Sequence, residues 1–174
     1  MGYRITTLGH LPIEEDVNLY IFIVKLGFNT ELAKLIDDNF EVLARRIGPH
    51  QSAIVDGLND DWPNQVLSVF FGADWKTIKQ YCPLMLITNA HPKDVDDDSL
   101  RLVVPLEEVH KVHGTYDRFF AELSEFAENR NTEFLDKFED QTNIVGTINE
   151  IIDIKPNVFG FGININKIIE KLTQ

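Results

Sequence analysis

Hydrophobic residues form short runs and helical stripes along the first 130 residues of the chain. Residues 17–24 are almost continuously apolar and aromatic, which is typical of a strand covered on both faces of a sheet. An amphipathic helix is predicted next, with Asn29 or Thr30 as its N-cap and Gly48 at its end. Its apolar residues at helical spacing are Leu32, Leu35, Ile36, Phe40, Leu43 and Ile47.

A second strand is predicted over residues 52–58, where a short apolar run ends in a polar turn. Because a helix separates the two strands, we expect a right-handed crossover and parallel pairing. Residues 62–71 carry the next helical pattern, which stops at Gly72, and a further helical turn is expected over residues 74–80.

The pattern then changes to two strands without a helix between them. Residues 83–88 and 100–105 are apolar, and the eleven residues 89–99 that separate them are mostly polar. A connection of that length leaves no room for a packed crossover helix, so we expect the pair to be antiparallel. The last core helix follows, with a single apolar stripe of Tyr116, Phe119, Phe120, Leu123, Phe126 and Ala127.

The C-terminal part is less regular. Residues 132–138 and 167–172 suggest short helices, and residues 143–154 fit either a helix or a strand. Between them lies a segment with strand periodicity, in which one face is kept very small. Its large residues are Phe159, Phe161, Ile163 and Ile165, and they alternate with Gly160, Gly162, Asn164 and Asn166. Small residues alternating with large ones suit a strand that adds to the edge of another sheet, so this segment is the leading candidate for an interaction element.

The order strand, helix, strand, helix, antiparallel strand pair and helix is similar to the thioredoxin fold over residues 17–129. One motif position agrees as well, because Tyr81-Cys82-Pro83 stands where the resemblance implies a cis-proline. The place of the redox Cys-x-x-Cys pair instead reads Gly27-Phe28-Asn29-Thr30. The resemblance therefore implies a degenerate, redox-inactive scaffold.

We accordingly expect an α/β fold, a thioredoxin-like three-layer sandwich with a mixed sheet and a C-terminal extension. Residues 1–131 would form the domain and residues 132–174 the extension. A different small α/β sandwich, including a flavodoxin-like one, is the alternative, although it would need a parallel continuation of the sheet. Residues 156–166 also resemble short tails of bacterial multi-component signalling or defence proteins.

Composition and charge restrict the partners. With 174 residues, 44% of them hydrophobic, the chain is long enough for one domain and a tail. The formal net charge of -12 disfavours nucleic acid and anionic membrane surfaces. Neither a signal peptide nor a membrane-spanning run is found, and the single cysteine excludes an intramolecular disulfide. We expect a cytoplasmic protein without a cofactor that binds another protein and is able to form homo-oligomers.

Cys82 is the first candidate for chemistry, because it is the only thiol and precedes Pro83. A nucleophilic cysteine needs a group that stabilises its thiolate, and Lys79 is the one basic residue close to it in sequence. The pattern favours a small buried hydrophobic residue instead.

Two patterns suggest metal ligands. Asp94, Asp96 and Asp98 begin like a calcium loop, but Ser99 and Pro105 stand where an EF-hand needs glycine and glutamate, so we interpret the run as a solvated acidic loop. Glu107, His110 and His113 recur every three residues, which would suit zinc if one helical face held them all. The alternative, a surface helix that contains two histidines, is favoured.

Two further sites concern binding. Gly160-Phe161-Gly162 lacks the third glycine and the long helix of a dinucleotide fingerprint, so it is not a phosphate site. Trp62 follows a polar turn and is either packed over the core or exposed as a binding anchor. The sequence thus predicts a non-enzymatic binding or adaptor protein that uses Trp62, Phe159, Phe161 and Ile163. A single-cysteine thiol or redox enzyme with Cys82 and Pro83 at its centre is the alternative.

Overall fold

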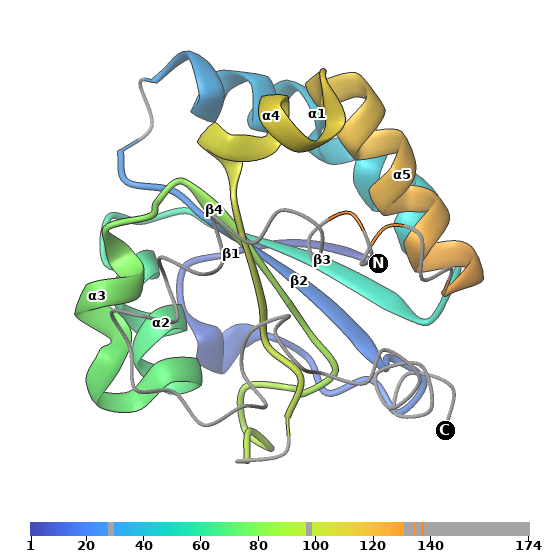
Figure 1. Ribbon diagram of the computed structural model, residues 1–174. Coiled ribbons are helices and arrows are strands. Elements are labelled where there is room, and N and C mark those ends of the chain that lie inside the picture. The colour runs from blue at the N-terminus through green and yellow to red at the C-terminus, as the bar shows by residue number, and fades with distance from the viewer. Residues whose placement is uncertain (28–29, 97–98, 131–133, 135–136, 138–174) are drawn as a thin grey trace.

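A mixed five-stranded sheet with helices packed against both faces forms the fold (Figure 1). The structure is a computed structural model, and it describes residues 1–27, 30–96, 99–130, 134 and 137. The strand order is β1-β3-β2-β4-β5. This arrangement confirms the predicted α/β class and the mixed sheet.

The central strand is β2 (Leu19–Val24), and all six of its residues are buried. Helix α1 (Glu31–Ile47) follows, with the Thr30 side chain accepting a hydrogen bond from the Ala33 N–H and Gly48 as C-cap. It leads into β3 (Ser52–Gly57), which pairs parallel with β2. The predicted strand, helix and parallel strand are therefore confirmed, because continuous apolar runs and caps are strong local signals.

Strand β1 (Gly2–Ile5) was not predicted. It pairs parallel with β3 at the edge of the sheet, and the 3-10 helix η1 (Leu8–His10) follows it. The alternation of Tyr3 and Ile5 with Gly2 and Arg4 is the signal that identifies it in retrospect. Such a signal is weak because only four residues carry it and half of them are exposed.

The second half of the sheet is antiparallel, as predicted. Helix α2 (Trp62–Phe71), the 3-10 helix η2 (Gly72–Asp74) and helix α3 (Trp75–Lys79) lead to β4 (Leu84–Thr88) and then β5 (Leu102–Pro105). Strand β4 lies antiparallel between β2 and β5. A flavodoxin-like alternative requires a parallel continuation of the sheet, and the antiparallel pairing of β4 differs from it. The peptide bond between Cys82 and Pro83 is cis.

The chain then crosses to the face of the sheet that α1 covers. It forms the 3-10 helix η3 (Leu106–Glu108), helix α4 (Val109–His113) and helix α5 (Tyr116–Asn129). Arg130 ends α5 in the left-handed region, and its guanidinium donates to the Asn18 side chain, the His50 carbonyl and the Ser52 hydroxyl. One side chain thus ties the end of α5 to the start of β2 and β3.

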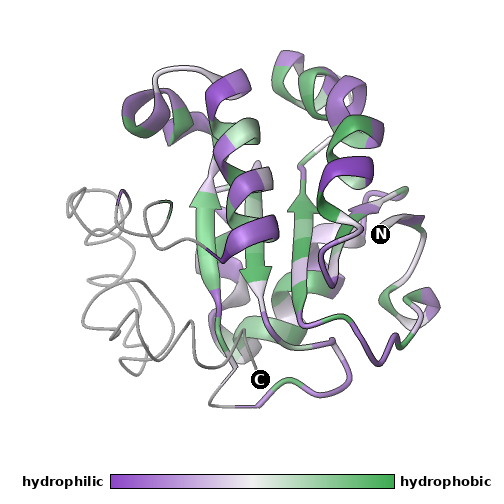
Figure 2. Cartoon of the chain, turned by 90° about the vertical axis from the view of Figure 1, so that its right-hand side faces the viewer, coloured by the Kyte–Doolittle hydropathy of each residue, from purple (hydrophilic) through white to green (hydrophobic). Residues whose placement is uncertain are grey.

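Two apolar layers enclose the sheet. One contains Ile21, Ile23, Phe40 and Phe126 under α1 and α5, and the other contains Phe22, Val55 and Phe70 under α2. In Figure 2 the strands are mainly green, and the helices turn purple faces outward. The alternation along β2 explains this division, because successive side chains of a strand point to opposite faces.

None of the helices in the described part of the chain combines the length and the apolar character needed to cross a membrane. The predictions for residues 143–154, 156–166 and 167–172 lie outside the described residues. Within the predicted helix 132–138 only Phe134 and Lys137 are described, and both are helical.

Candidate functional site

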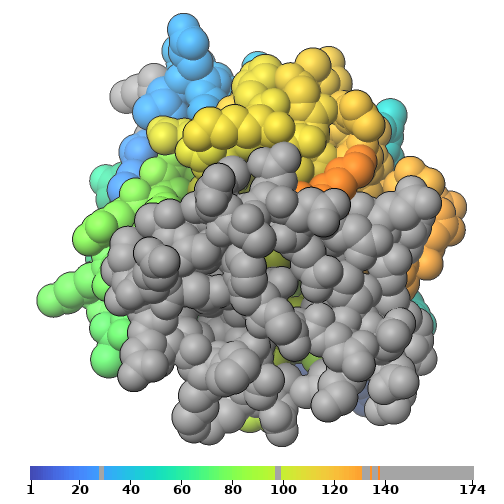
Figure 3. Space-filling view, viewed as in Figure 1, coloured from blue at the N-terminus to red at the C-terminus, as the bar shows by residue number. Residues whose placement is uncertain are grey.

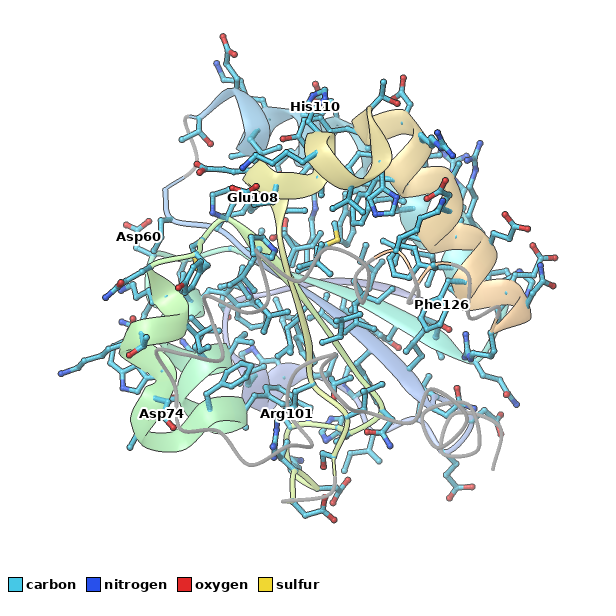
Figure 4. All side chains as sticks on the ribbon, in the orientation of Figure 1. Asp60, Asp74, Arg101, Glu108, His110 and Phe126 are labelled. Atoms are coloured by element: carbon cyan, nitrogen blue, oxygen red, sulfur yellow. The ribbon has the colours of Figure 1, made fainter. Side chains whose placement is uncertain are left out.

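Three neighbouring strands bring chemically distinct residues to one end of the sheet. The parallel register that pairs Ile23 with Asp56 places Lys25 beside Leu58. The antiparallel pairing of Val24 with Leu84 places Pro83 on the other side of Lys25. In Figure 4, Asp60 and Glu108 lie toward one end of the sheet and Arg101 lies toward the other. We call the surface formed by Leu26, Leu58, Cys82 and Pro83 the β2–β3 end.

A buried ion pair lies beneath this end. The Lys25 ammonium donates to Asp56 Oδ2 at 2.9 Å and to Asp37 Oδ1 at 2.8 Å. The side chains of Lys25 and Asp56 are only 4% and 2% exposed, whereas that of Asp37 is 37% exposed. Arg4 adds a second cation, 3.5 Å from Asp37 Oδ1 and 4.0 Å from Asp56 Oδ2. The network joins β1, β2, β3 and α1.

The Asp56 carboxylate is only partly satisfied. Its Oδ1 atom is buried and has no hydrogen-bond partner among the described residues. Burial raises the pKa of Asp56, while the hydrogen bond from Lys25 acts in the opposite direction. Because charges are costly to bury unless paired, Lys25 and Asp56 depend on each other inside the fold.

Trp62 packs over the core, which is the first of the two alternatives that the sequence offered. Its side chain is 2% exposed, and its indole N–H donates to the carbonyl of Ile23 at 2.7 Å. The ring covers Gly57 so closely that a Cβ atom there would lie 1.9 Å from Trp62 Cγ. The Trp62 ring is enclosed because it fills the space that Gly57 leaves at the end of β3. An exposed binding anchor needs an accessible indole, so Trp62 does not fit that role.

Two leucines are exposed at the β2–β3 end. Leu26 is 44% exposed and Leu58 is 53% exposed, and each follows the end of a parallel strand. Gly27 comes next with φ of +76°, a left-handed conformation that glycine adopts without strain. The backbone therefore turns sharply after Leu26 and leaves this side chain at the surface.

Cys82, the third residue of the β2–β3 end, is half-buried. Burial raises its pKa to about 12, and the nearby Lys79 lowers it only in part. The ammonium of Lys79 donates to the Asn64 side chain at 2.8 Å and lies 5.6 Å from the Trp75 ring centre. At neutral pH the thiol is therefore protonated, so it is a poor nucleophile.

Glu107, His110 and His113 do not converge. Glu107 and His110 are exposed, and His110 lies on the outer side of α4 in Figure 4. Its Nδ1 atom is 2.7 Å from the carbonyl oxygen of Gly114. His113 is 1% exposed and lies against Phe119 and Phe134. The three residues do not share one helical face. Glu107 lies in the 3-10 turn before α4, and within α4 His110 faces solvent whereas His113 faces the core.

Glu122 connects His113 to the surface. One carboxylate oxygen is 2.5 Å from His113 Nδ1, and the other accepts from Arg118 at 2.8 Å and lies 2.6 Å from Lys137 Nζ. Burial raises the pKa of Glu122, but hydrogen bonds from Lys137, Arg118 and His113 outweigh it and bring the pKa to about 2. Burial also lowers the pKa of His113.

This depressed pKa predicts a loss of stability in acid. Since the folded-state pKa of Glu122 is about 2 and its ordinary value is 4.5, the stabilisation is complete above pH 4.5 and is lost as the pH falls toward 2. We expect Glu122→Gln to lower the free energy of unfolding by about 1 to 2 kcal/mol at pH 7 and by much less at pH 2.5. Urea titrations at both pH values measure this difference. Glu125→Gln on the exposed side of α5 is the control, and equal pH dependence in both variants would contradict the assignment.

The acidic loop of residues 91–99 borders a cavity at the opposite end of the sheet. The cavity has a volume of about 430 Å³, and its walls include Glu14, Tyr20, Asp94 and Ser99. Asp96 accepts from the Ser99 hydroxyl at 2.7 Å, while Asp98 lies outside the described residues. No group of three or more histidine, cysteine, aspartate or glutamate residues in the described part of the chain is placed to hold a metal ion.

Sequence reasoning missed the Lys25–Asp56 pair. A signal for it existed, because Lys25 directly follows the apolar run and Asp56 interrupts the second run. A charge inside a buried strand needs a partner of opposite charge, and adjacent parallel strands supply one. The other predicted binding residues, Phe159, Phe161 and Ile163, lie outside the described residues.

The chain was compared with family models, with curated proteins and with solved structures, and none of these comparisons finds a match. The fold itself defines an α/β protein with a mixed five-stranded sheet.

Proposed function

We propose that the protein is a non-enzymatic binding or adaptor domain on a redox-inactive thioredoxin-like scaffold, with the β2–β3 end as its surface for another protein. The pair of exposed leucines, Leu26 and Leu58, is the observation that carries this proposal. Following the likeness of residues 156–166 to bacterial tails, we place the partner in a bacterial multi-protein system.

The topology supports the choice of scaffold. Helix α1 connects the parallel strands β2 and β3, and the sheet continues with the antiparallel strands β4 and β5. The bond before Pro83 is cis, at the position that the resemblance implies. Residues 27–30 contain no cysteine, and because Cys82 is the single cysteine of the sequence, an intramolecular dithiol pair is excluded.

The properties of the surface support protein binding. Leu26 and Leu58 leave apolar area in water at the ends of neighbouring strands, and a partner that covers them gains about 25 cal/mol for each Å² removed from water. Beneath them the Lys25–Asp56 pair holds the ends of β2 and β3 together. A rigid surface loses little conformational freedom when it binds, which favours association.

The state of Cys82 weighs against the alternative of a thiol enzyme. We expect Cys82 in the native protein to react with an aromatic disulfide reagent at pH 8 at least about a hundred-fold more slowly than free cysteine. The reason is that a pKa of about 12, against an ordinary value of 9.0, leaves a roughly thousand-fold smaller thiolate fraction. Absorbance after addition of the reagent measures the rate, and the urea-unfolded protein is the control. Rapid reaction in the folded state would favour the enzyme.

Replacement of each exposed leucine by aspartate tests the surface. Leu26→Asp and Leu58→Asp should fold normally, because both side chains are substantially exposed, and should lower partner affinity at least about ten-fold. Affinity capture with the full chain, followed by mass spectrometry and titration of the recovered partner, measures this change.

Matched controls come from the helices on each face. Val42 on α1 is 40% exposed and Val69 on α2 is 42% exposed, so Val42→Asp and Val69→Asp introduce the same charge away from the β2–β3 end. Equal binding by all four variants would exclude this surface. Turnover that disappears in Cys82→Ser would show that the protein is an enzyme.

A further inference from the structure

A second group of polar side chains surrounds the cavity at the other end of the sheet. Because β2 and β4 are antiparallel, Tyr20 near the start of β2 pairs with Thr88 at the end of β4. Residues 13–17, which precede β2, therefore meet residues 89–96, which follow β4, at this cavity. Arg101 marks this end of the sheet in Figure 4, whereas helix α4 lies at the opposite end, at the top of Figure 3. The cavity is thus separate from the β2–β3 end.

The cavity is large enough for a small organic molecule. Its volume of about 430 Å³ lies within the range of pockets that hold small ligands. Its described walls carry three carboxylates, from Glu14, Asp94 and Asp96, and apolar side chains such as Ile13 and Val17. Among the wall residues that the structure describes there is no lysine or arginine. The walls therefore favour a ligand with a positive charge and an apolar part.

Tyr20 places an unpaired polar group at the same cavity. It is 3% exposed and belongs to the apolar layer that contains Leu11 and Val17. Its ring centre lies 6.2 Å from that of Phe22 and 5.7 Å from that of His91, so described neighbours hold the ring in place. Its hydroxyl has no hydrogen-bond partner in the described part of the chain, although Tyr20 lines the cavity. A buried tyrosine hydroxyl usually has such a partner, so this one is available to a ligand.

Two of the carboxylates lie close to this hydroxyl. Burial raises the pKa of Tyr20, and the negative charges of Asp94 and Glu14 raise it further. Glu14 is held on the other side by Tyr3, whose hydroxyl donates to Glu14 Oε1 at 3.2 Å. The protonated Tyr20 hydroxyl keeps an acceptor oxygen, and the carboxylates give its surroundings a negative potential. A donor N–H group with a positive charge fits both features.

The kind of cation is narrowed by the spacing of the walls. The carboxylates in the described part of the chain are not gathered closely enough to hold a metal ion, which needs several oxygen ligands within about 2.6 Å. An ammonium group instead reaches separate acceptors through its three N–H donors. Arg101 donates to the carbonyl of Asp96, but neither it nor Lys93 is among the described wall residues. The charge of the ligand thus faces carboxylates.

We propose that this cavity binds a small organic ammonium ion. Its charged group pairs with Glu14 and Asp94 and donates to the Tyr20 hydroxyl, while its carbon skeleton packs against Ile13 and Val17. Small anions are repelled by the same carboxylates. Because the cavity lies at the opposite end of the sheet from Leu26 and Leu58, this site is independent of the surface proposed for a protein partner.

Nuclear magnetic resonance titration of the full chain with 2-phenylethylammonium chloride tests the proposal. We expect saturable shifts of the Ala90 and His91 amides with a Kd on the order of 1 mM, as suits a ligand with few atoms. The neutral 2-phenylethanol has nearly the same shape without the charge, so we expect it to bind at least about ten-fold more weakly.

Three variants locate the binding. Asp94→Asn should weaken binding of the ammonium probe about five-fold or more, and Tyr20→Phe, which removes only the hydroxyl, about three-fold or more. Asp38→Asn on the exposed side of α1 removes the same charge elsewhere and should change the affinity less than about two-fold. Amides of β3 report whether each variant remains folded.

Preferential binding of the ammonium probe that is weakened in Asp94→Asn and in Tyr20→Phe, but not in Asp38→Asn, supports the site. The absence of saturable shifts, or equal binding of 2-phenylethanol, would overturn it. Equal weakening in Asp94→Asn and Asp38→Asn would also overturn it, since the effect would then come from net charge. Saturable shifts with CaCl₂ but not with the ammonium probe would replace the proposal by a metal site.

Discussion

Lys25→Met is expected to lower the free energy of unfolding by about 3 to 5 kcal/mol. The substitution removes the cation 2.9 Å from Asp56 and keeps most of the volume of the side chain. The Asp56 carboxylate then stays buried with Arg4, 4.0 Å away, as its remaining cation. Chemical denaturation followed by circular dichroism measures the loss. A change below 1 kcal/mol would contradict the importance of the pair.

A double variant distinguishes two causes of this loss: the lost attraction between Lys25 and Asp56, and the cost of leaving the Asp56 carboxylate buried without its cation. In Lys25→Met, Asp56→Leu no buried charge remains, so we expect at least about 2 kcal/mol of the loss to be recovered. Arg4→Met is the control, because the side chains of Arg4 and Asp37 are 36% and 37% exposed and water screens their ion pair. It should cost less than about 1 kcal/mol.

The single variant should also respond to pH in a characteristic direction. Loss of Lys25 removes the hydrogen bond that lowers the pKa of Asp56, so burial raises this pKa further. A group whose pKa is raised on folding contributes most at low pH and loses that contribution as the pH rises. Lys25→Met should therefore be less destabilised, relative to the wild type, at pH 4 than at pH 7.

Gly57→Ala is expected to cost about 3 kcal/mol or more and to yield little folded protein at 37 °C. The added Cβ would lie 1.9 Å from Trp62 Cγ and 2.3 Å from Trp62 Cδ2. The indole has little freedom to move, because it is 2% exposed and bonded to the Ile23 carbonyl. Thermal unfolding measured by tryptophan fluorescence and circular dichroism gives the loss.

Gly9→Ala is the matched control, since the nearest atom to an added Cβ there is Thr7 Oγ1 at 3.8 Å. It should change the stability by less than about 0.5 kcal/mol. Trp62→Leu should itself be destabilising, but Gly57→Ala should cost much less in that background, since the clash is gone. Additive losses would show that the contact between the two residues is not the cause.

Local patterns predicted most of the elements correctly. Three of these patterns are local: the apolar run that ends at Val24, the apolar stripe of α1 and the N-cap at Thr30. A strand buried on both faces is continuously apolar, and a helix buried on one side repeats its apolar residues every three or four positions, so a few residues are enough to recognise each element. Strand β1 was missed because pairing with β3, rather than its own composition, makes it a strand.

The candidate site was predicted only in part. Sequence reasoning selected Cys82 and Pro83 and considered both alternatives for Trp62. It could not show that Trp62 is enclosed or that the pKa of Cys82 is raised, because both depend on neighbours distant in the chain. His110 and His113 share a spacing that suggests a common face, yet the 3-10 turn and the contact with Glu122 separate them.

The α/β class, the order of the main elements, the antiparallel strand pair and the absence of a redox cysteine pair follow from the amino-acid sequence alone, since periodicity, capping and composition can be recognised without the fold. Three facts depend on the three-dimensional fold: Lys25 contacts Asp56, Gly57 makes room for Trp62, and Leu26 and Leu58 remain exposed at one end of the sheet. The first and the third of these facts arise from strand register, which brings together residues more than thirty positions apart, and the second arises where the start of α2 packs on the end of β3. The free energy of burying Lys25 and Asp56 therefore depends on the residues that the fold assembles around them, and not on either residue alone.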